Sequence, residues 1–350
     1  MRKTVIYSAI MMATLSGCQL TSVAEVCPAS TRVDLAQAEV PAVGSANAKV
    51  LVIPANIEFD DHAKARIQKA ITSSIEDQID EAGRQIVDRK TALKLKDEII
   101  LAEQSGRYNT KGIPVADYAV ITDINYANFS KHFSEASTTI DLDGNLKYVP
   151  PACRFEAEVK ANTRIVTLPD MKTVENIQFV GSEYQSTETR NSSCPFSKEQ
   201  YQGLVTEAAK NAILRNDKLK NILAPSGSVV EMRQCEVGTM VKVDMGSDNG
   251  VTPDWEMKFV TREKVAKVDG DGFEIETHGY GEGTVVNNAE HGIKPNYSWV
   301  VIDEEMAPKV RRGDTVKASF ENLCNNSIFG SVGILSKMCH QTNETLNGGI

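Results

Sequence analysis

The stretch Lys49-Val50-Leu51-Val52-Ile53-Pro54-Ala55 is the point from which the fold of this chain can be read. Its apolar, mostly β-branched run predicts a short buried strand. Apolar residues then recur at spacings of three and four over residues 61–82, and Gly83 follows them. This pattern predicts an amphipathic helix with a glycine at its C-terminal cap. A buried strand that leads into such a helix indicates a sheet with a helix packed on it.

The same alternation of strands and helices continues along the chain. Residues 85–88 predict a second strand, residues 91–104 a second helix, and residues 118–124 a third strand. Antiparallel strands are expected next. Two alternating runs flank the dipeptide Asp143-Gly144, which is typical of a β-hairpin turn. Two longer strands are predicted over residues 155–168 and 174–184.

A helix is predicted after these strands, and then the character of the sequence changes. Ser197 and Gln200 form a capping-box pattern at the start of the helix. Pro225-Ser226-Gly227 marks a boundary, beyond which short alternating runs are separated by glycine and aspartate turns. We therefore expect an α+β domain over residues 49–225, a small β-barrel over residues 226–320 and a tail over residues 321–350.

The N-terminus has the layout of an export signal. Arg2 and Lys3 precede an apolar run over residues 5–15, and Leu15-Ser16-Gly17-Cys18 ends it. This ending resembles the lipobox of bacterial lipoproteins, which implies a signal peptide over residues 1–17 and a lipid on Cys18. A plain signal peptide and a buried helix are the alternatives. Because a spanning helix needs roughly 20 apolar residues, the run is too short to cross a membrane as a helix.

The segment after the lipid site is expected to be a tether. Residues 18–48 contain much Ala, Ser, Val and Pro and show no sustained periodicity. Gln19 rather than aspartate follows the cysteine, which by resemblance to lipoprotein sorting rules favours the outer membrane. The formal net charge is −9 and no Lys/Arg cluster is present, so nucleic acid is not expected as a partner.

The later cysteines predict disulfide bonds, because an exported chain reaches an oxidising compartment. They are Cys27, Cys153, Cys194, Cys235, Cys324 and Cys339. Cys153 with Cys194, and Cys324 with Cys339, are the preferred pairs, although other connectivities and buried free thiols remain open. None of these cysteines forms a C-x-x-C pair, so the sequence gives no support for a zinc site or thioredoxin-like chemistry.

No catalytic constellation is evident. The chain has no P-loop, HExxH, GxSxG or GxGxxG pattern. Asp88-Arg89 is interpreted as a helix cap and a local ion pair, and Asp117 as a side chain that binds backbone at a strand start. Asp269-Gly270-Asp271-Gly272-Phe273 is interpreted as a hairpin turn, because Phe273 stands where a calcium loop needs an oxygen ligand. No catalytic residue, metal site or cofactor is therefore expected.

An aromatic cluster is the candidate partner-binding site. Tyr126, Phe129 and Phe133 lie close together, with His132 between them, at the start of the inserted hairpin. These side chains are expected either to meet a partner or membrane interface, or to pack against the hairpin.

The first domain resembles the CsgG family, the lipoproteins of curli secretion. Val52-Ile53-Pro54, Ile86-Val87-Asp88-Arg89, the "AEQSG" helix end at residues 102–106 and Ala116-Asp117-Tyr118 carry this resemblance in order. The glycine that usually precedes "ADY" in the family is Val115 here. The resemblance covers about residues 49–220 and implies a CsgG-like α/β sandwich.

The second domain resembles the C-terminal module of flagellar assembly protein T. The match rests on Gly246-Ser247-Asp248-Asn249-Gly250-Val251 after a strand, and on Arg312-Gly313-Asp314-Thr315-Val316 near the end of the module. In such modules these two turns belong to a small barrel.

Together, these features predict a non-enzymatic lipoprotein of the outer membrane that faces the periplasm and scaffolds a cell-envelope machine. Its partners are then other envelope proteins, copies of itself among them. The alternative is a subunit of a CsgG-like secretion channel, in which hairpins enter a shared barrel. The outward positions near the hairpins are polar, for example Lys131 and Glu183, which disfavours that alternative. A third class, an envelope hydrolase with a cryptic site, has no motif in its favour.

Overall fold

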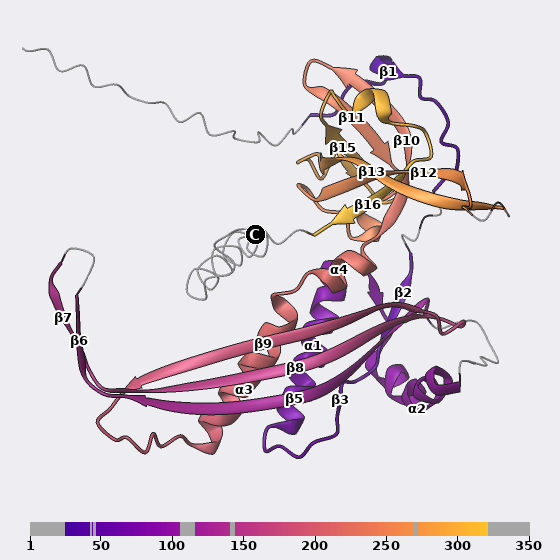
Figure 1. Cartoon of the computed structure of the whole chain (residues 1–350). Helices are drawn as coiled ribbons and strands as arrows, with labels where there is room; N and C mark the ends of the chain where they lie inside the picture. The colour runs from indigo at the N-terminus through magenta and orange to yellow at the C-terminus, as the bar shows by residue number, and fades with distance from the viewer. Residues whose placement is uncertain are drawn as a thin grey trace, which may run out of the picture.

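The computed structural model describes residues 25–42, 44, 47–105, 116–140, 144–268, 270 and 272–320, without the side chains of residues 103–105. The chain is mostly β-strand with a few helices, and it forms a helix-covered sheet followed by a barrel (Figure 1). The predicted signal peptide, the lipid site Cys18, the tail over residues 321–350 and its two cysteines Cys324 and Cys339 lie outside the described residues.

The first sheet combines a parallel part with three long antiparallel strands. Its strands are β2 (Lys49–Val52), β3 (Asn56–Ile57), β4 (Gln85–Ile86), β5 (Tyr118–Ser134), β8 (Ala152–Thr167) and β9 (Thr173–Glu188). The order is β4-β2-β5-β8-β9, with β3 also paired to β5. β2 is parallel to β4 and β5, whereas β5, β8 and β9 run antiparallel to one another.

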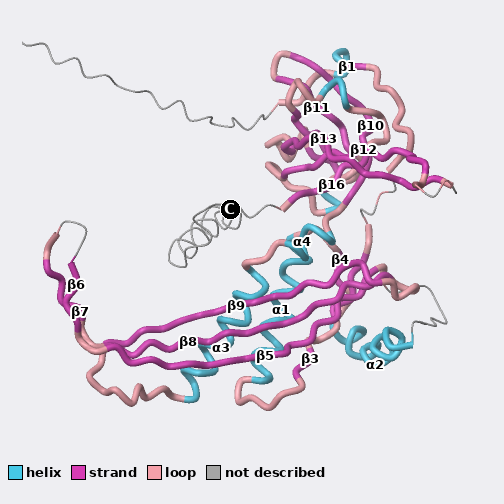
Figure 2. Tube along the Cα trace, viewed as in Figure 1, coloured by secondary structure: helices cyan, strands magenta, loops and turns pink. Residues whose placement is uncertain are grey.

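Helices cover both faces of this sheet. α1 (Lys64–Glu81), α3 (Lys198–Leu214) and α4 (Lys218–Leu223) share one hydrophobic core with the strands, and α2 (Arg89–Ser105) packs on the opposite face (Figure 2). Ile67, Ile71 and Ile75 of α1 are fully buried, as their spacing predicts. At the start of α3, Ser197 and Gln200 form the predicted capping box.

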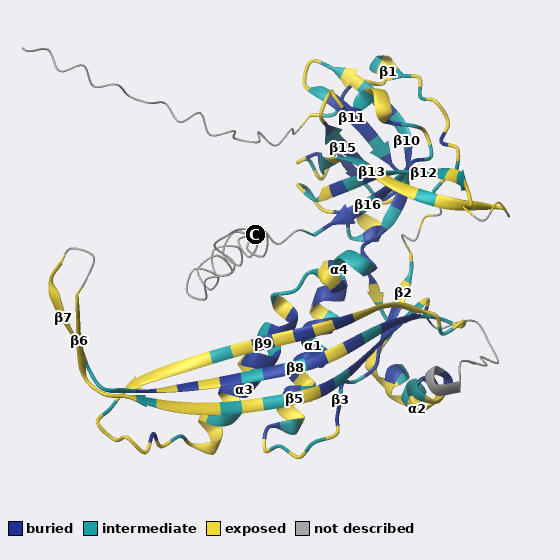
Figure 3. Ribbon diagram, in the orientation of Figure 1, coloured by how far each residue is buried: buried dark blue, intermediate teal, exposed yellow. Residues whose placement is uncertain are grey.

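The long strands have one buried and one open face (Figure 3). Along β8, Phe155, Ala157 and Val159 point into the core, and polar residues alternate with them. The polar residues pair within their own face, because Lys160 Nζ lies 2.8 Å from Glu158 and Arg164 lies 3.0 Å from Asp123. This alternation is that of an antiparallel sheet with one face in water.

The second domain is a closed six-stranded barrel, which confirms the predicted small β-barrel. Its strands are β10 (Ser226–Cys235), β11 (Gly238–Val243), β12 (Glu256–Ala266), β13 (Phe273–Val285), β15 (Tyr297–Ile302) and β16 (Thr315–Ser319). β10 pairs with both β11 and β16, which closes the circle. Smaller elements complete the domain: β1 (Arg32–Val33), β14 (Ile293–Lys294) and the 3₁₀ helices η1 (Ala29–Thr31), η2 (Ser247–Asn249) and η3 (Ala307–Lys309).

The tether predicted over residues 18–48 is wrong in its extent. Cys27 is buried and forms a disulfide with Cys235, 208 positions away. β1 then pairs with β10, and Ala38 N donates to Arg312 O at 2.9 Å. Residues 25–42 therefore belong to the barrel domain, because a covalent bond and strand pairing hold them there.

A buried arginine holds the end of α4, beside the junction of the two domains. The guanidinium of Arg84 donates to the carbonyl oxygens of Leu223 and Ala224, at the end of α4. Burial lowers the pKa of Arg84 to about 10. Nearby, the side chain of Asn221 bonds the backbone N–H and carbonyl of Phe320 at 2.8 and 2.7 Å. The end of β16 is thus fixed to α4.

Candidate interaction surface

A two-stranded hairpin extends beyond the long sheet and contacts little else (Figure 1). We call residues 137–149 the arm; its strands are β6 (Ser137–Ile140) and β7 (Leu146–Val149). The ladder between β5 and β8 ends at the pair Ser134 and Ala152. Pro150 and Pro151 separate the two ladders, and since proline has no N–H, the pairing cannot run through them.

The arm has an apolar face that the described residues leave uncovered. Ile140 is paired with Leu146, and Thr138 with Tyr148, so these four side chains share one face. The exposed fractions are 70% for Ile140, 76% for Leu146 and 63% for Tyr148. Such a face normally packs on a core, and three large apolar side chains gathered in water indicate an interaction surface.

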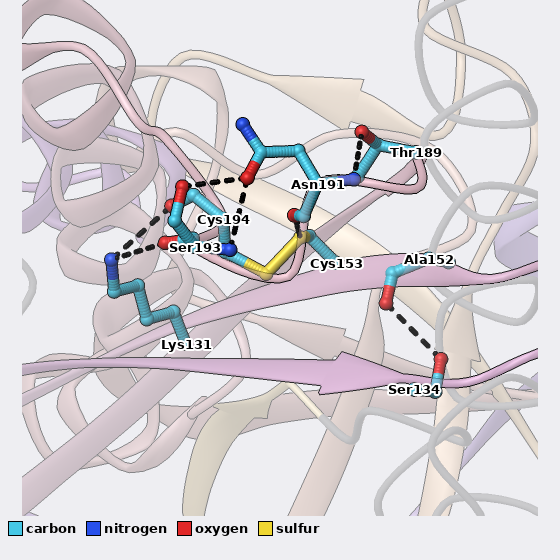
Figure 4. Close-up of a disulfide and its surroundings, with 8 residues drawn as sticks. All are labelled: Lys131, Ser134, Ala152, Cys153, Thr189, Asn191, Ser193 and Cys194. Carbon is cyan, nitrogen blue, oxygen red and sulfur yellow. Dashed lines mark hydrogen bonds between the residues drawn. A yellow bond between two sulfur atoms is a disulfide. The ribbon is translucent and has the colours of Figure 1, made fainter.

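The base of the arm is fixed by the disulfide between Cys153 and Cys194, which confirms the predicted pair (Figure 4). Both cysteines are buried. Lys131 Nζ, on β5, donates to Ser193 O at 2.8 Å and to Cys194 O at 3.3 Å. Asn191 Oδ1 accepts from both the backbone N–H and the hydroxyl of Ser193. The loop after β9 is thereby held against β5 and β8.

Stacked aromatic rings lie beside the disulfide. The rings of Phe155 and Phe196 stack with centroids 4.1 Å apart, and Phe129 stacks on Phe196 at 5.2 Å. Tyr201 of α3 meets Phe129 edge-on at 5.4 Å, and its hydroxyl donates to Asp61. Burial and the neighbouring Asp61 carboxylate raise the pKa of Tyr201. The arm therefore projects from a tightly packed base.

The three aromatic residues proposed from sequence divide between this base and the surface. Phe129 and Phe133 pack against the core of the first domain, and not against the hairpin, which was the alternative expected from sequence. Tyr126 is exposed on the open face, with Lys160 Nζ 5.1 Å from its ring centroid. Of the three, only Tyr126 remains a candidate for contact with a partner.

Ile140, Leu146 and Tyr148 were not among the residues proposed from sequence. The hairpin itself was expected from Asp143-Gly144. An alternating pattern shows which side chains share a face, but it does not show that nothing in the chain covers that face. The signal for these residues was therefore present in the pattern, and only the three-dimensional structure reveals their exposure.

Asp88, Arg89 and Asp117, which the sequence analysis interprets as structural, make such contacts. Asp88 caps α2, since its Oδ1 accepts from Lys90 N at 2.8 Å, and hydrogen bonds from Thr91 and Lys90 lower its pKa. Arg89 Nε donates to Glu76 at 2.8 Å. Asp117 accepts from Lys49 N at 2.7 Å. These contacts confirm the predicted cap, local ion pair and backbone contact.

Neither a metal-binding cluster nor a membrane-crossing helix is found among the described residues. Among them, no three His, Cys, Asp or Glu side chains are grouped so that they could hold a metal ion. In the same part of the chain, no helix combines the length and the hydropathy that a membrane-crossing helix needs.

Comparisons with known proteins give distant structural likenesses only. No family model and no curated protein matches the chain. Among solved structures, lipoprotein GNA1162 from Neisseria meningitidis is 16% identical over 48% of this chain and 99% of its own, with a TM-score of 0.22. A neuraminyllactose-binding hemagglutinin homolog from Helicobacter pylori is 10% identical over 53% and 91%, with a TM-score of 0.31. The PelC dodecamer from Paraburkholderia phytofirmans is 12% identical over 51% and 95%, with a TM-score of 0.19. Because these scores are low, function is inferred from the residues of this chain alone.

Proposed function

We propose that this protein is a lipid-anchored lipoprotein of the outer membrane that faces the periplasm and helps to assemble a cell-envelope machine, without catalysing a reaction. The lipobox at Cys18 supports the anchor. The first domain is then a CsgG-like α/β sandwich, a proposal supported by the sequence resemblance and by helices on both faces of the sheet.

The apolar face of the arm carries this proposal. Ile140, Leu146 and Tyr148 expose apolar area that would be removed from water when a partner binds. The arm is short, and the Cys153–Cys194 disulfide at its base holds the loop after β9 against the start of β8. A short projection with an exposed apolar face on a fixed base suits protein–protein docking.

Docking on a protein fits the arm better than the channel alternative. Each paired strand of the arm has four residues, whereas a membrane-crossing strand needs about 9–11. The open face of the long strands beside it carries ion pairs such as Lys160–Glu158. Charged side chains on a face that meets lipid are destabilising.

The central experiment is photo-crosslinking in intact cells from position 146. A photoactivatable residue at Leu146 should yield a discrete adduct, and the triple variant Ile140→Ser/Leu146→Ser/Tyr148→Ser should lose the native complex seen on a blue native gel. The matched control is Leu93→Ser/Leu101→Ser/Val174→Ser, which removes three exposed apolar side chains elsewhere. A triple arm variant that assembles like the unchanged protein would refute the docking role.

The lipid anchor has its own test. Cys18→Ala should move the protein from the membrane to the soluble fraction, because the covalent lipid is its proposed attachment. Mass spectrometry of the mature unchanged protein should show the lipid on Cys18. Retention of the Cys18→Ala protein in washed membranes would contradict this part of the proposal.

A further inference from the structure

A second hairpin, formed by the outer ends of β12 and β13, also has an exposed apolar tip. Val268 is fully exposed at 104%, Phe273 is 72% exposed and Ile275 is 49% exposed. The tip is ordered by backbone hydrogen bonds, since Lys267 N donates to Gly272 O at 3.1 Å and Gly270 N donates to Lys267 O at 2.9 Å. Backbone hydrogen bonds thus link the described residues beside these exposed apolar side chains.

The two faces of this hairpin differ in chemistry. Phe273 lies opposite Ala266, and Ile275 lies opposite Lys264, so these side chains share one face. The alternate positions, Glu274 with Val265 and Glu276 with Glu263, place the acidic residues on the other face. An aromatic and aliphatic face bordered by lysine suits the lipid–water interface, where rings lie at headgroup level and ammonium groups reach phosphate.

The N-terminal disulfide limits how far the lipid can lie from the barrel. Cys18 and Cys27 are nine positions apart in the sequence, and a fully extended chain spans at most about 3.6 Å per residue, or roughly 30 Å in all. Cys27 is bonded to Cys235 at the end of β10. A lipid on Cys18, as in the proposed function, therefore keeps the membrane surface within about one small-domain diameter of this disulfide.

The hairpin tip and the disulfide are both reached along strands that leave the same level of the barrel, and Figure 1 shows the tip projecting from the side of the barrel. β10 and β12 are both antiparallel to β16, so both run in the same direction. Lys317 is the register partner of Ser226 in β10 and of Lys258 in β12. From that level β10 continues for about 30 Å to Cys235, and β12 for about 26 Å to Ala266, at roughly 3.3 Å per residue.

The arm lies toward the other end of the molecule. Lys317 precedes Phe320, which is bonded to Asn221 where the two domains meet. Across that junction, β5 starts at Tyr118 and runs for 17 residues to the base of the arm, about 55 Å at the usual rise. Figure 1 shows the arm and the β12–β13 hairpin projecting from different domains.

We propose that the barrel is the membrane-proximal domain, and that the β12–β13 tip contacts the phospholipid surface in which Cys18 is anchored. This inference rests on the proposed lipidation. The lipid anchor then limits the distance to the membrane, and the hairpin tip sets the orientation, which leaves the arm directed toward partners away from that membrane.

Tryptophan fluorescence on the full-length lipidated protein tests the contact. The protein is reconstituted in vesicles of phosphatidylethanolamine and phosphatidylglycerol whose acyl chains carry bromine, which quenches tryptophan on contact. The native Trp255 and Trp299 provide a constant background. After this background is subtracted, the emission added by Phe273→Trp should be blue-shifted and quenched at least about twofold in the brominated vesicles. Glu274→Trp, on the opposite face of the same hairpin, should be quenched less.

The arm gives the decisive control. Tyr148→Trp should not be quenched. If the reconstituted protein floats with the vesicles but Phe273→Trp is no more quenched than Glu274→Trp, the membrane contact is refuted while the lipoprotein proposal stands. Quenching at Tyr148→Trp instead would refute the orientation. If the protein lacks lipid on Cys18 and does not float, it is the proposed function that fails.

Discussion

The arm and the β12–β13 hairpin both project apolar side chains into water. The residues packed at the base of the arm are mainly apolar, whereas those at the base of the β12–β13 hairpin include a buried polar group. Beneath the arm lie the disulfide of Cys153 and the stacked rings of Phe129, Phe155 and Phe196. Beneath the β12–β13 hairpin lies a buried polar group, Asp314. The apolar base depends on packing and covalent closure, whereas the polar base depends on hydrogen bonds and on protonation.

The polar base is centred on one carboxylate oxygen. Asp314 Oδ2 accepts from Tyr280 OH at 2.8 Å and from Arg311 N at 2.8 Å. Burial raises the pKa of Asp314, although these hydrogen bonds oppose that effect. Burial and the Asp314 carboxylate also raise the pKa of Tyr280. The two hairpins should therefore respond differently to truncation, to reduction and to acid.

The largest expected difference is between two phenylalanines. Phe155→Ala should lower the free energy of unfolding by about 3–5 kcal/mol, because it opens a cavity in the buried stack. Phe273→Ala, at an exposed tip, should change it by less than about 0.5 kcal/mol. Urea unfolding followed by far-UV circular dichroism measures both. Equal losses would show that the β12–β13 tip is packed as closely as the base of the arm.

Loss of the disulfide should come next. Cys153→Ala/Cys194→Ala opens a loop of 41 residues and should cost about 2–4 kcal/mol. Both tryptophans, Trp255 and Trp299, lie in the barrel, so their fluorescence reports on that domain while circular dichroism reports on both. The fluorescence transition should shift less than the dichroism transition. Identical shifts would mean that the two domains unfold as one unit.

The sequence predicts local structure here better than long-range contacts. The α1 helix was expected over residues 61–82 and is found at Lys64–Glu81, since its apolar spacing and Gly83 are local signals. The capping box at Ser197 and the hairpin around Gly144 are equally local. The third strand, expected over residues 118–124, instead runs from Tyr118 to Ser134. Its second half has no strong alternation of its own and is fixed by pairing with β8.

The N-terminal segment shows where sequence reasoning fails. Cys27 lies in a stretch without periodicity, and its partner Cys235 is 208 positions away, so no local pattern relates the two. By contrast, Cys153 and Cys194 are separated by 41 positions, one in β8 and the other in the loop after β9, and this pair was predicted correctly. The candidate surface follows the same rule. Its hairpin was predictable from local sequence. The exposure of Leu146 was not, because it depends on where the rest of the chain lies.

A smaller effect is expected at the polar base. Tyr280→Phe removes the hydroxyl that donates to Asp314 and should cost about 1–3 kcal/mol, because a buried carboxylate loses a hydrogen bond. The tryptophan fluorescence transition in urea measures this cost. The matched substitution at the arm base is Tyr201→Phe, which removes the donor to Asp61. It should perturb the dichroism transition more than the fluorescence transition, and the reverse would argue against separate bases.

The smallest expected effect is a pH dependence that belongs to the barrel hairpin alone. The folded-state pKa of Asp314 is raised above its ordinary value of 3.8, so the folded protein binds this proton more tightly than the unfolded chain does. The stability gained from that proton is fully present below pH 3.8 and is lost as the pH rises through the folded-state pKa. Relative to Asp314→Asn, the unchanged protein should therefore gain stability as the pH is lowered from 7 toward 4. Urea midpoints from tryptophan fluorescence at several pH values give the difference. A difference that stays constant, or that grows in favour of Asp314→Asn in acid, would show that Asp314 is not the protonation site that distinguishes the two hairpins.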